Sequence, residues 1–275
     1  MAAVSVSTNI AALISIQNLS GINAQLEQVQ NELSTGLRVS SALDDASSFA
    51  IAQGLRADIK SFQAVSQGIA NGKGTAEVAL AGATSISDLL GDIEAKVTTG
   101  LDPGQTTLQQ QILQADFNNL VAQINQFITS SAYNGKNLLS SGSPNVSVLA
   151  NISGSTLTIR GNSQIVQAAT ILASQAVSTT SAALLALSQV NAASVTISVV
   201  LSNLGADSRS ITFQDEFISE VIDAQEIGLG AIVDADLAKA SARLAALQVQ
   251  QQLAVQTLSI ANSNPKILLG LFSSS

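Results

Sequence analysis

A long apolar stripe close to the C-terminal end constrains this chain more than any other feature. Its members recur at alternating steps of three and four residues, which places them on one face of an α-helix over several heptads. Only Gln251 is polar among the stripe positions, which are Leu237, Ala240, Leu244, Leu247, Gln251, Ala254, Leu258 and Ala261. We expect this helix to end at Pro265. Such a stripe requires another helix to pack against it along most of its length.

A second stripe lies near the other end of the chain, at Ile22, Leu26, Val29, Leu33 and Leu37. Neither terminal stripe has a neighbouring helix within a short loop, so the two must pair with each other or with another molecule. Helices of about 35–40 residues span roughly 50–60 Å at 1.5 Å per residue. A rod of two such helices has little core of its own, and helical stability comes mainly from packing. The pattern therefore predicts self-association.

The middle of the chain carries further helical stripes. One recurs every seven residues and predicts a long helix with a possible kink at Gly72 and Gly74. Asp102-Pro103-Gly104 ends it, and a third helix and a fourth follow. The members are Leu55, Phe62, Ile69, Ala76, Ala83, Leu90 and Val97 in the long helix, Leu113, Phe117, Leu120, Ile124 and Phe127 in the next, and Leu187, Val190, Ile197, Leu201, Leu204, Ile211, Ile218 and Ile222 in the last.

Residues 141–163 lack the helical period. Apolar residues alternate there on both sides of a turn at 151–154, which predicts a β-hairpin; they are Val146, Val148, Leu157 and Ile159. Tyr133-Asn134-Gly135-Lys136 predicts a tight turn before it. The predicted fold class is mainly α, with long antiparallel helices forming a coiled-coil and bundle core and a small β-hairpin region.

Composition excludes several kinds of function. The chain has no Cys and no His, which rules out disulfides, thiolate ligands and every mechanism that depends on imidazole. Its net charge of −8 offers no basic surface to nucleic acid. No uninterrupted apolar run approaches the ~18 residues of a membrane-spanning helix, so we expect no membrane insertion. We predict no catalytic residue, no cofactor and no metal site, and the chain is not expected to be an enzyme.

Two pairs of acidic residues, Asp44 with Asp45 and Asp234 with Asp236, could in principle serve acid–base chemistry or bind a cation. Both pairs lie beside expected helix starts, where capping and the helix dipole favour carboxylates. We therefore interpret them as capping or lattice contacts. Arg38 and Arg56 could be charge partners for Asp44 and Asp45, within or between subunits, or solvated surface residues.

Several motifs taken together resemble bacterial flagellin. At the N-terminal end these are Thr8-Asn9, Leu33-Ser34-Thr35-Gly36-Leu37-Arg38-Val39, Asp44-Asp45-Ala46 and Thr75-Ala76-Glu77. At the C-terminal end they are Asp234-Ala235-Asp236, Gln251-Gln252, Ala261-Asn262, Pro265 and Leu271-Phe272. The resemblance covers about residues 1–140 and 190–272, in order.

The resemblance implies a structural subunit that polymerises into the flagellar filament used for swimming. Residues 1–40 with 233–275 would form an inner coiled coil lining the central channel, and 41–140 with 164–232 an outer core bundle. With only the hairpin region at 141–163 between them, the chain resembles a minimal flagellin without large outer domains. Alternatives are a hook–filament junction protein, which shares the terminal helices, and a type III-secreted translocator or effector.

Further implications concern partners and assembly residues. The family partners are further copies of the chain, the flagellar export machinery, an export chaperone, and hook-associated and cap proteins, and the location is the secreted, extracellular filament. The residues expected to carry self-assembly are Leu26, Val29, Leu33, Leu37, Arg38, Asp44, Asp45, Asp234, Asp236, Leu244, Leu247, Gln251, Leu258, Asn262, Leu271 and Phe272.

Overall fold

The computed structural model describes residues 8–272, with side chains described up to residue 263. The chain divides into two compact units. The first combines the residues up to 57 with those from 224 onward, and the second holds residues 58–223. The first unit therefore combines the two ends of the chain, whereas the second is one continuous segment.

Helices dominate the described residues, and two of them are very long. The helices α2 and α5 each have 54 residues, roughly 80 Å at 1.5 Å per residue. The helices are α1 (Ile10–Thr35), α2 (Ala46–Thr99), α3 (Thr107–Ser130), α4 (Gln164–Ala173), α5 (Thr180–Val233) and α6 (Leu237–Phe272). The strands are β1 (Ala132–Tyr133), β2 (Lys136–Asn137), β3 (Val146–Leu149) and β4 (Thr156–Ile159). The predicted mainly-α class, with long antiparallel helices and a small hairpin region, is confirmed.

Helix ends follow local capping signals. The Asn9 side chain accepts a hydrogen bond from the Ala12 N–H at the start of α1. Thr106 and Gln109 form a capping box at the start of α3. Gly36 ends α1 in the left-handed conformation, at φ 71°. The helix therefore stops before Leu37, the last member of its predicted stripe.

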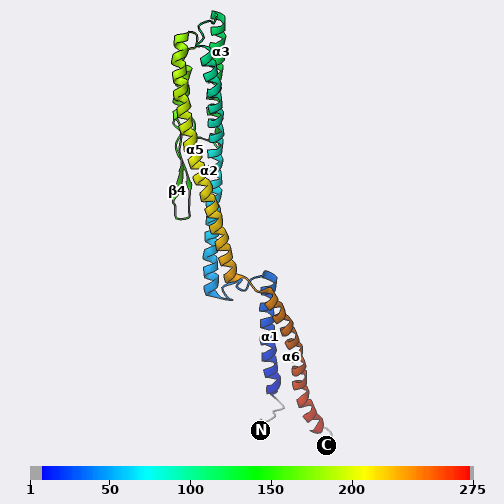
Figure 1. Cartoon of the computed structure of the whole chain (residues 1–275). Helices are drawn as coiled ribbons and strands as arrows, with labels where there is room; N and C mark the ends of the chain where they lie inside the picture. The colour runs from blue at the N-terminus through cyan, green and yellow to red at the C-terminus, as the bar shows by residue number, and fades with distance from the viewer. Residues whose placement is uncertain (1–7, 273–275) are drawn as a thin grey trace. The chain divides into compact units, whose positions relative to one another are not determined.

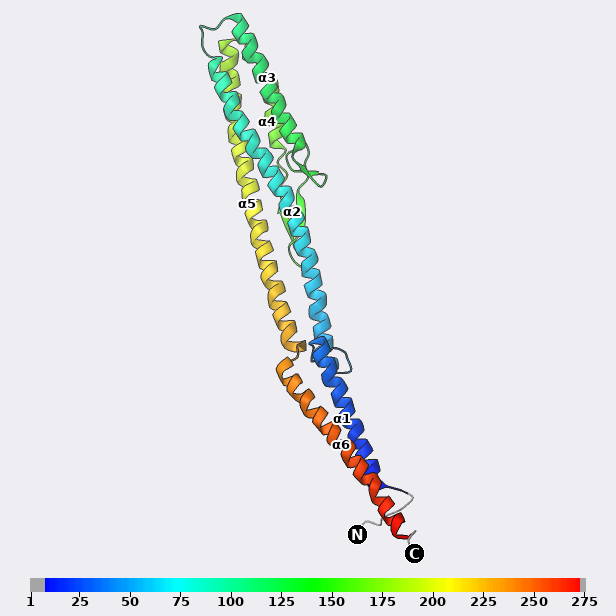
Figure 2. The ribbon, with the colours of Figure 1, turned by 90° about the vertical axis from the view of Figure 1, so that its right-hand side faces the viewer.

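The second unit has a continuous apolar core contributed by α2, α3, α4 and α5 together with the β-hairpin. Its α2 members include the seven-residue series predicted from the sequence, for Ile69, Ala76, Ala83, Leu90 and Val97 are all buried. The two long helices run antiparallel beside each other within this unit (Figures 1 and 2). Their side chains exclude water along the length of the bundle, which is the main source of its stability.

Both predicted turns are antiparallel hairpins. Asn134 and Gly135, both at positive φ, join β1 to β2. Strands β3 and β4 pair with Val146 opposite Ile159 and Val148 opposite Leu157. This hairpin lies inside the 141–163 region that the sequence indicated.

Helix α2 is continuous from Ala46 to Thr99 and runs through Gly72 and Gly74. The two glycines permit close approach of neighbouring segments. A Cβ at Gly72 would lie 2.6 Å from Val148 Cγ1, and a Cβ at Gly74 would lie 2.9 Å from Tyr133 Cζ. These residues therefore make room for the hairpins, and the helix tolerates their low propensity because its faces are packed.

One expectation is corrected at the C-terminal end. Helix α6 continues through Pro265 to Phe272 instead of ending at the proline. Proline removes one backbone hydrogen bond and does not by itself prevent the following apolar residues from remaining helical.

Among the helices that the structure describes, α5 is long and apolar enough to cross a membrane by length and composition alone. One 18-residue window of it has a mean hydropathy of 1.8, with 28% of that window buried. Core helices of bundles pass the same test, and Val190, Ile197 and Leu204 of α5 are buried. That the chain does not enter a membrane stays a prediction.

Candidate self-assembly surface

The two terminal stripes meet within one chain. Helices α1 and α6 lie side by side, coloured blue and orange to red in Figures 1 and 2. Val29, Ala240 and Leu247 are buried between them, and four further members are partly buried against these: Ile22, Leu26, Leu33 and Leu244. The contact follows the predicted spacing, because each helix turns its three-and-four face toward the other.

Two side-chain hydrogen bonds connect the two helices of this pair. Gln251, the polar member of the C-terminal stripe, donates from Nε2 to Asn23 Oδ1 at 2.8 Å. Asn9, which caps α1, also donates from Nδ2 to the Ala261 carbonyl oxygen at 2.8 Å. Both bonds join residues of α1 or its cap to α6.

The segments that follow α1 and precede α6 are joined by backbone hydrogen bonds. Leu37 and Asp234 form an antiparallel bridge. The Arg38 N–H donates to the Val233 carbonyl at 2.7 Å, and the Ala235 N–H donates to the Gly36 carbonyl at 2.9 Å. A small apolar cluster, Val39, Ala52 and Val233 with Leu37, Phe49, Leu229 and Ile232 around it, packs here. The junction is thus held by backbone pairing and a core of its own.

The first acidic pair serves local structure. Asp44 accepts hydrogen bonds from the backbone N–H and hydroxyl groups of Ser40 and Ser41, at 2.9–3.2 Å. The Ser40 hydroxyl, followed by the two N–H groups, holds the pKa of Asp44 below its ordinary value. Asp45 accepts from the Ser47 and Ser48 N–H groups at the start of α2, and from the Ser48 hydroxyl at 2.6 Å. That hydroxyl is the main cause of the lowered pKa of Asp45.

The second acidic pair lies at the start of α6. Asp236 accepts from the Lys239 N–H at 3.0 Å and so caps the helix. Asp234 contributes its backbone to the bridge with Leu37. Both pairs therefore occupy the positions next to helix starts that the sequence indicated.

The Arg38 guanidinium donates a hydrogen bond to a backbone carbonyl. Its Nη2 donates to the Ile232 carbonyl oxygen at 2.6 Å. Its positive charge is the smallest of the influences that lower the pKa of Asp45. The residue therefore ties the segment after α1 to the end of α5.

The remaining predicted assembly residues differ in placement. Leu258 is half-buried, and Asn262 is exposed. Leu271 and Phe272 belong to the backbone of α6, but their side chains lie outside the described residues. Gln251 thus joins the described helix contact through its hydrogen bond to Asn23.

Three features of this unit were missed at the sequence level. Asn9 and Asn23 link the two ends of the chain, and Leu43 exposes 98% of its surface at the tip of a loop. The Asn9 cap could have been recognised, since asparagine directly before an apolar run is a helix-start signal. Nothing in the sequence pattern marks Leu43 as exposed, because loop residues follow no repeating pattern of buried and exposed positions.

The terminal helix pair leaves many large apolar side chains in water. Only Ala12, Ser15 and Val29 are buried in the 26-residue α1. Exposed large apolar residues of the pair include Ile10, Leu13, Ile14, Ile16, Leu237, Val249, Leu253, Val255 and Ile260. Large apolar side chains left in water at this density are typical of surfaces that bind another molecule.

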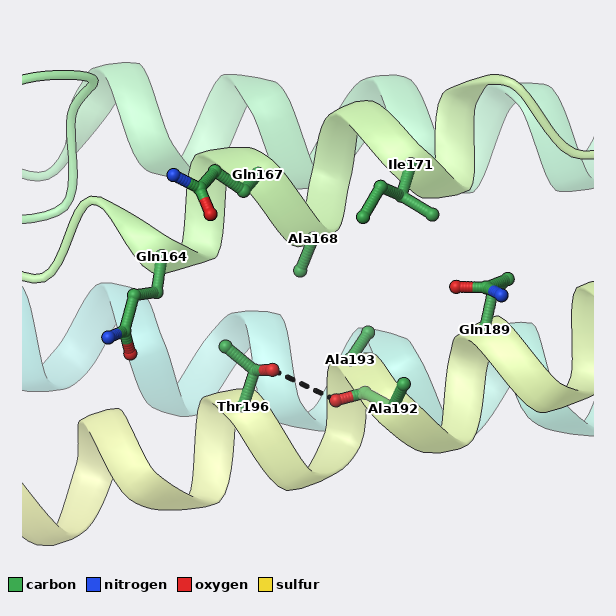
Figure 3. A pocket seen from close by; sticks show the side chains of 8 residues that line it. All are labelled: Gln164, Gln167, Ala168, Ile171, Gln189, Ala192, Ala193 and Thr196. Atoms are coloured by element: carbon green, nitrogen blue, oxygen red, sulfur yellow. Dashed lines mark hydrogen bonds between the residues drawn. The ribbon is translucent and has the colours of Figure 1, made fainter.

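Enzyme-like features are sparse in the part of the chain that the structure describes. No group of three or more acidic side chains is placed there to hold a metal ion. A groove of about 320 Å³ between α4 and α5 is lined by amides and methyl groups (Figure 3). The Thr196 hydroxyl in this groove donates to the Ala192 carbonyl at 2.9 Å. Gln164, Gln167 and Gln189 supply neither an acid nor a base at neutral pH.

The two terminal regions of the chain match family models, and the chain as a whole matches curated proteins. Residues 6–143 match the bacterial flagellin N-terminal helical region, and residues 187–272 match the bacterial flagellin C-terminal helical region. Flagellin FljM of Caulobacter vibrioides is 35% identical over 272 residues, covering 99% of this chain and 100% of that protein. A flagellin of Brucella melitensis is 35% identical, covering 98% and 99%. A crystal structure of Bacillus cereus flagellin matches 64% of this chain and 94% of its own, with TM-score 0.42 and 12% identity.

Proposed function

Because this chain belongs to the bacterial flagellin family and is a structural subunit of the flagellar filament, we propose that its terminal helices are the assembly core. Residues 1–40 with 233–275 form an inner coiled coil around the central channel. Residues 41–140 with 164–232 form the outer core bundle, and 141–163 the hairpin region. The chain is not an enzyme, and neither the hook–filament junction protein nor the secreted effector is favoured by the matches.

One observation carries this proposal: the helix pair of α1 and α6 buries one apolar face and exposes another. Leu253 is 55% exposed and Ile10 is 59% exposed, although both are large aliphatic residues. Each such side chain gains up to about 1.5–3 kcal/mol when it is fully removed from water. Burial against neighbouring copies would supply the stability that a two-helix rod lacks.

The predicted assembly residues divide into two roles in this proposal. Residues at the α1–α6 contact and the junction present the pair as one rigid surface: Leu26, Val29, Leu33, Leu37, Arg38, Asp234, Asp236, Leu244, Leu247, Gln251 and Leu258. Asp44 and Asp45 shape the loop before α2, and Asn262 stands free to meet a neighbour. We assign the same inter-subunit role to Leu271 and Phe272.

The partners outside the polymer follow from the family and from the exposed apolar surface. Before polymerisation, Val249, Val255 and Ile260 of α6 face water. An export chaperone would cover such residues until the chain is handed to the flagellar export machinery. Secretion through that route would place the subunit outside the cell. There, hook-associated proteins and cap proteins would flank the filament at its two ends.

Electron microscopy of the purified chain after reassembly tests this function. Uniform helical filaments are expected, and a bacterial strain lacking its own flagellin should swim when it expresses this chain. A chain that stays monomeric under conditions in which a Caulobacter flagellin polymerises would overturn the assignment. An effector or translocator would give no filaments in the same preparation.

A further inference from the structure

Pro265 lies inside helix α6 and is the one proline within the helices that the structure describes. In an α-helix the backbone N–H of each residue donates to the carbonyl oxygen four positions earlier. Proline has no N–H, so the carbonyl four residues before it loses its helical donor. In this chain that carbonyl belongs to Ala261. The proline that α6 accommodates therefore leaves one backbone acceptor to be satisfied in another way.

The Ala261 carbonyl finds a donor at the other end of the sequence. Ala261 is buried, with 7% of its surface accessible. A buried carbonyl without a donor costs free energy, because water does not replace the missing bond. The Asn9 side chain supplies the donor, since its Nδ2 lies 2.8 Å from the Ala261 carbonyl oxygen across 252 positions of sequence.

The same side-chain amide serves both helices at once. Its Oδ1 accepts a hydrogen bond from the Ala12 N–H at 3.1 Å and so caps α1, while its Nδ2 donates to α6. Serine, threonine and aspartate also cap helices. Of these residue types, only asparagine has its acceptor and its donor on two different atoms, so that each partner has an atom of its own. Capping alone leaves the residue type at position 9 open, and the second bond accounts for asparagine.

The bond from Asn9 to Ala261 closes the end of the helix pair that lies away from the junction. At the junction, the Ala235 N–H donates to the Gly36 carbonyl and joins the end of α1 to the start of α6. Helix ends fray where their last turns carry unsatisfied backbone groups and few contacts. The pair is therefore held at both ends, by backbone pairing at one and by the Asn9 side chain at the other.

We propose that the Asn9 side-chain amide takes the place of the backbone N–H that Pro265 lacks. Helix α6 then continues through its proline at little cost when the start of α1 is docked against it, and the two ends of the chain become ordered together. Asn9 is in this sense a positioning residue for the terminal helix pair. The interaction lies within one chain, so it stands independently of polymerisation.

Removing the donor while keeping the cap isolates this bond. Asn9→Asp keeps the shape and the capping oxygen but has no donor at neutral pH, and Asn9→Ser makes the same separation without adding a charge. In the full-length monomer, each substitution should speed the amide exchange of residues 255–263 by about tenfold, the equivalent of one hydrogen bond. Quench-flow hydrogen exchange with mass spectrometry measures this change, and the amides of α3 should not respond.

The next measurement restores the missing N–H. Pro265→Ala gives residue 265 a backbone N–H for the Ala261 carbonyl, which then no longer depends on Asn9. In the Pro265→Ala background, Asn9→Asp and Asn9→Ser should therefore change the exchange of residues 255–263 by less than about twofold.

Asn23→Ala is the matched control, because it removes the acceptor of Gln251 from the same helix pair. Its effect on exchange should be the same with and without Pro265→Ala, since neither residue bonds the Ala261 carbonyl. Rescue that is confined to the Asn9 variants is the result that supports the proposal.

Equal effects of the Asn9 variants in the two backgrounds would overturn the proposal, because Asn9 would then be an ordinary contact between the helices. Unchanged exchange in both backgrounds would overturn it as well. Filament formation by the unmodified chain tests the proposed function separately, so the two can fail independently.

Discussion

Asp44 and Asp45 are adjacent carboxylates with separate structural tasks. Asp44 closes the loop that carries Leu43, and Asp45 caps α2. Serine hydroxyls and backbone N–H groups hold the pKa of each below the ordinary value of 3.8. A carboxylate in such a setting favours the folded loop only while it is ionised, because protonation removes acceptors for these donors.

We predict that acid opens this loop in a defined window. Because the folded pKa values are lowered, their contribution to stability is complete above the unfolded value of about 3.8 and is lost as the pH falls through the folded values. NMR titration of the Ser41 and Ser48 amide protons should show midpoints below 3.8. Asp44→Asn should remove the Ser41 titration. A midpoint above the ordinary value would contradict the assigned hydrogen bonds.

At the scale of elements, the β3–β4 hairpin packs onto α2 through the space left by Gly72. Val148 lies where a side chain at position 72 would be, and its β-branched side chain has little rotamer freedom with which to yield. Gly68, one turn earlier, has open space around it. The two glycines therefore provide a matched pair on one helix.

Gly72→Ala should destabilise the second unit by about 1–3 kcal/mol through overpacking against Val148, while Gly68→Ala should stabilise it by about 0.5–1 kcal/mol through helix propensity. Urea unfolding followed by circular dichroism measures both. Stabilisation by both substitutions would show that the hairpin does not press against α2 at this position.

The same hairpin is tied to α5 by an ion pair. Arg160 donates from Nη2 to Asp207 Oδ1 at 2.7 Å, and its backbone N–H donates to Oδ2 at 2.9 Å. The Asp207 carboxylate raises the pKa of Arg160. Since the Arg160 side chain is 48% exposed, solvent weakens the pair, and we expect Arg160→Ala to cost only about 1 kcal/mol. In this variant, amide exchange should become faster in β4 than in α5, relative to the unmodified chain. Unchanged exchange would contradict the role of the ion pair in holding the hairpin.

At the scale of the whole molecule, the terminal helices depend on neighbours more than the central bundle does. The bundle buries a long apolar core, whereas α1 buries three residues. In the monomer, amides of α1 and of α6 up to residue 263 should exchange with solvent faster than those of α3, and should become protected on polymerisation. Equal protection of both regions in the monomer, measured by hydrogen exchange with mass spectrometry, would count against the assembly role.

Leu258→Glu should abolish filament growth without unfolding the bundle. Leu258 is half-buried on the α6 stripe, and a carboxylate enclosed there without a partner costs about 1–3 kcal/mol in each subunit. The bundle core uses other residues, so circular dichroism should still report a helical monomer. Ser259→Glu, which adds the same charge at an exposed neighbouring position, is the control. Normal filaments from Leu258→Glu would show that this stripe is not part of the assembly core.

Periodic features were predictable from the sequence for a physical reason. The stripes that define α1, α2, α5 and α6 reflect the 3.6 residues per turn of an α-helix, which place residues three and four apart on the same face. The hairpin at 146–159 and the break at 102–104 followed from alternation and from turn residues. These elements also carried the resemblance to flagellin, so class, family and function could be read without coordinates.

Features without a periodic sequence pattern were decided by the tertiary structure. Gly72 and Gly74 suggested a weak point of α2 from the sequence, whereas the structure shows a continuous helix on which these glycines leave room for Val148 and Tyr133. Pro265 read as a helix end, yet α6 continues past it. The exposure of Leu43 depends on which segments happen to lie nearby. Local sequence sets helix faces through repeating geometry, whereas contacts between distant segments exist only once the chain has folded.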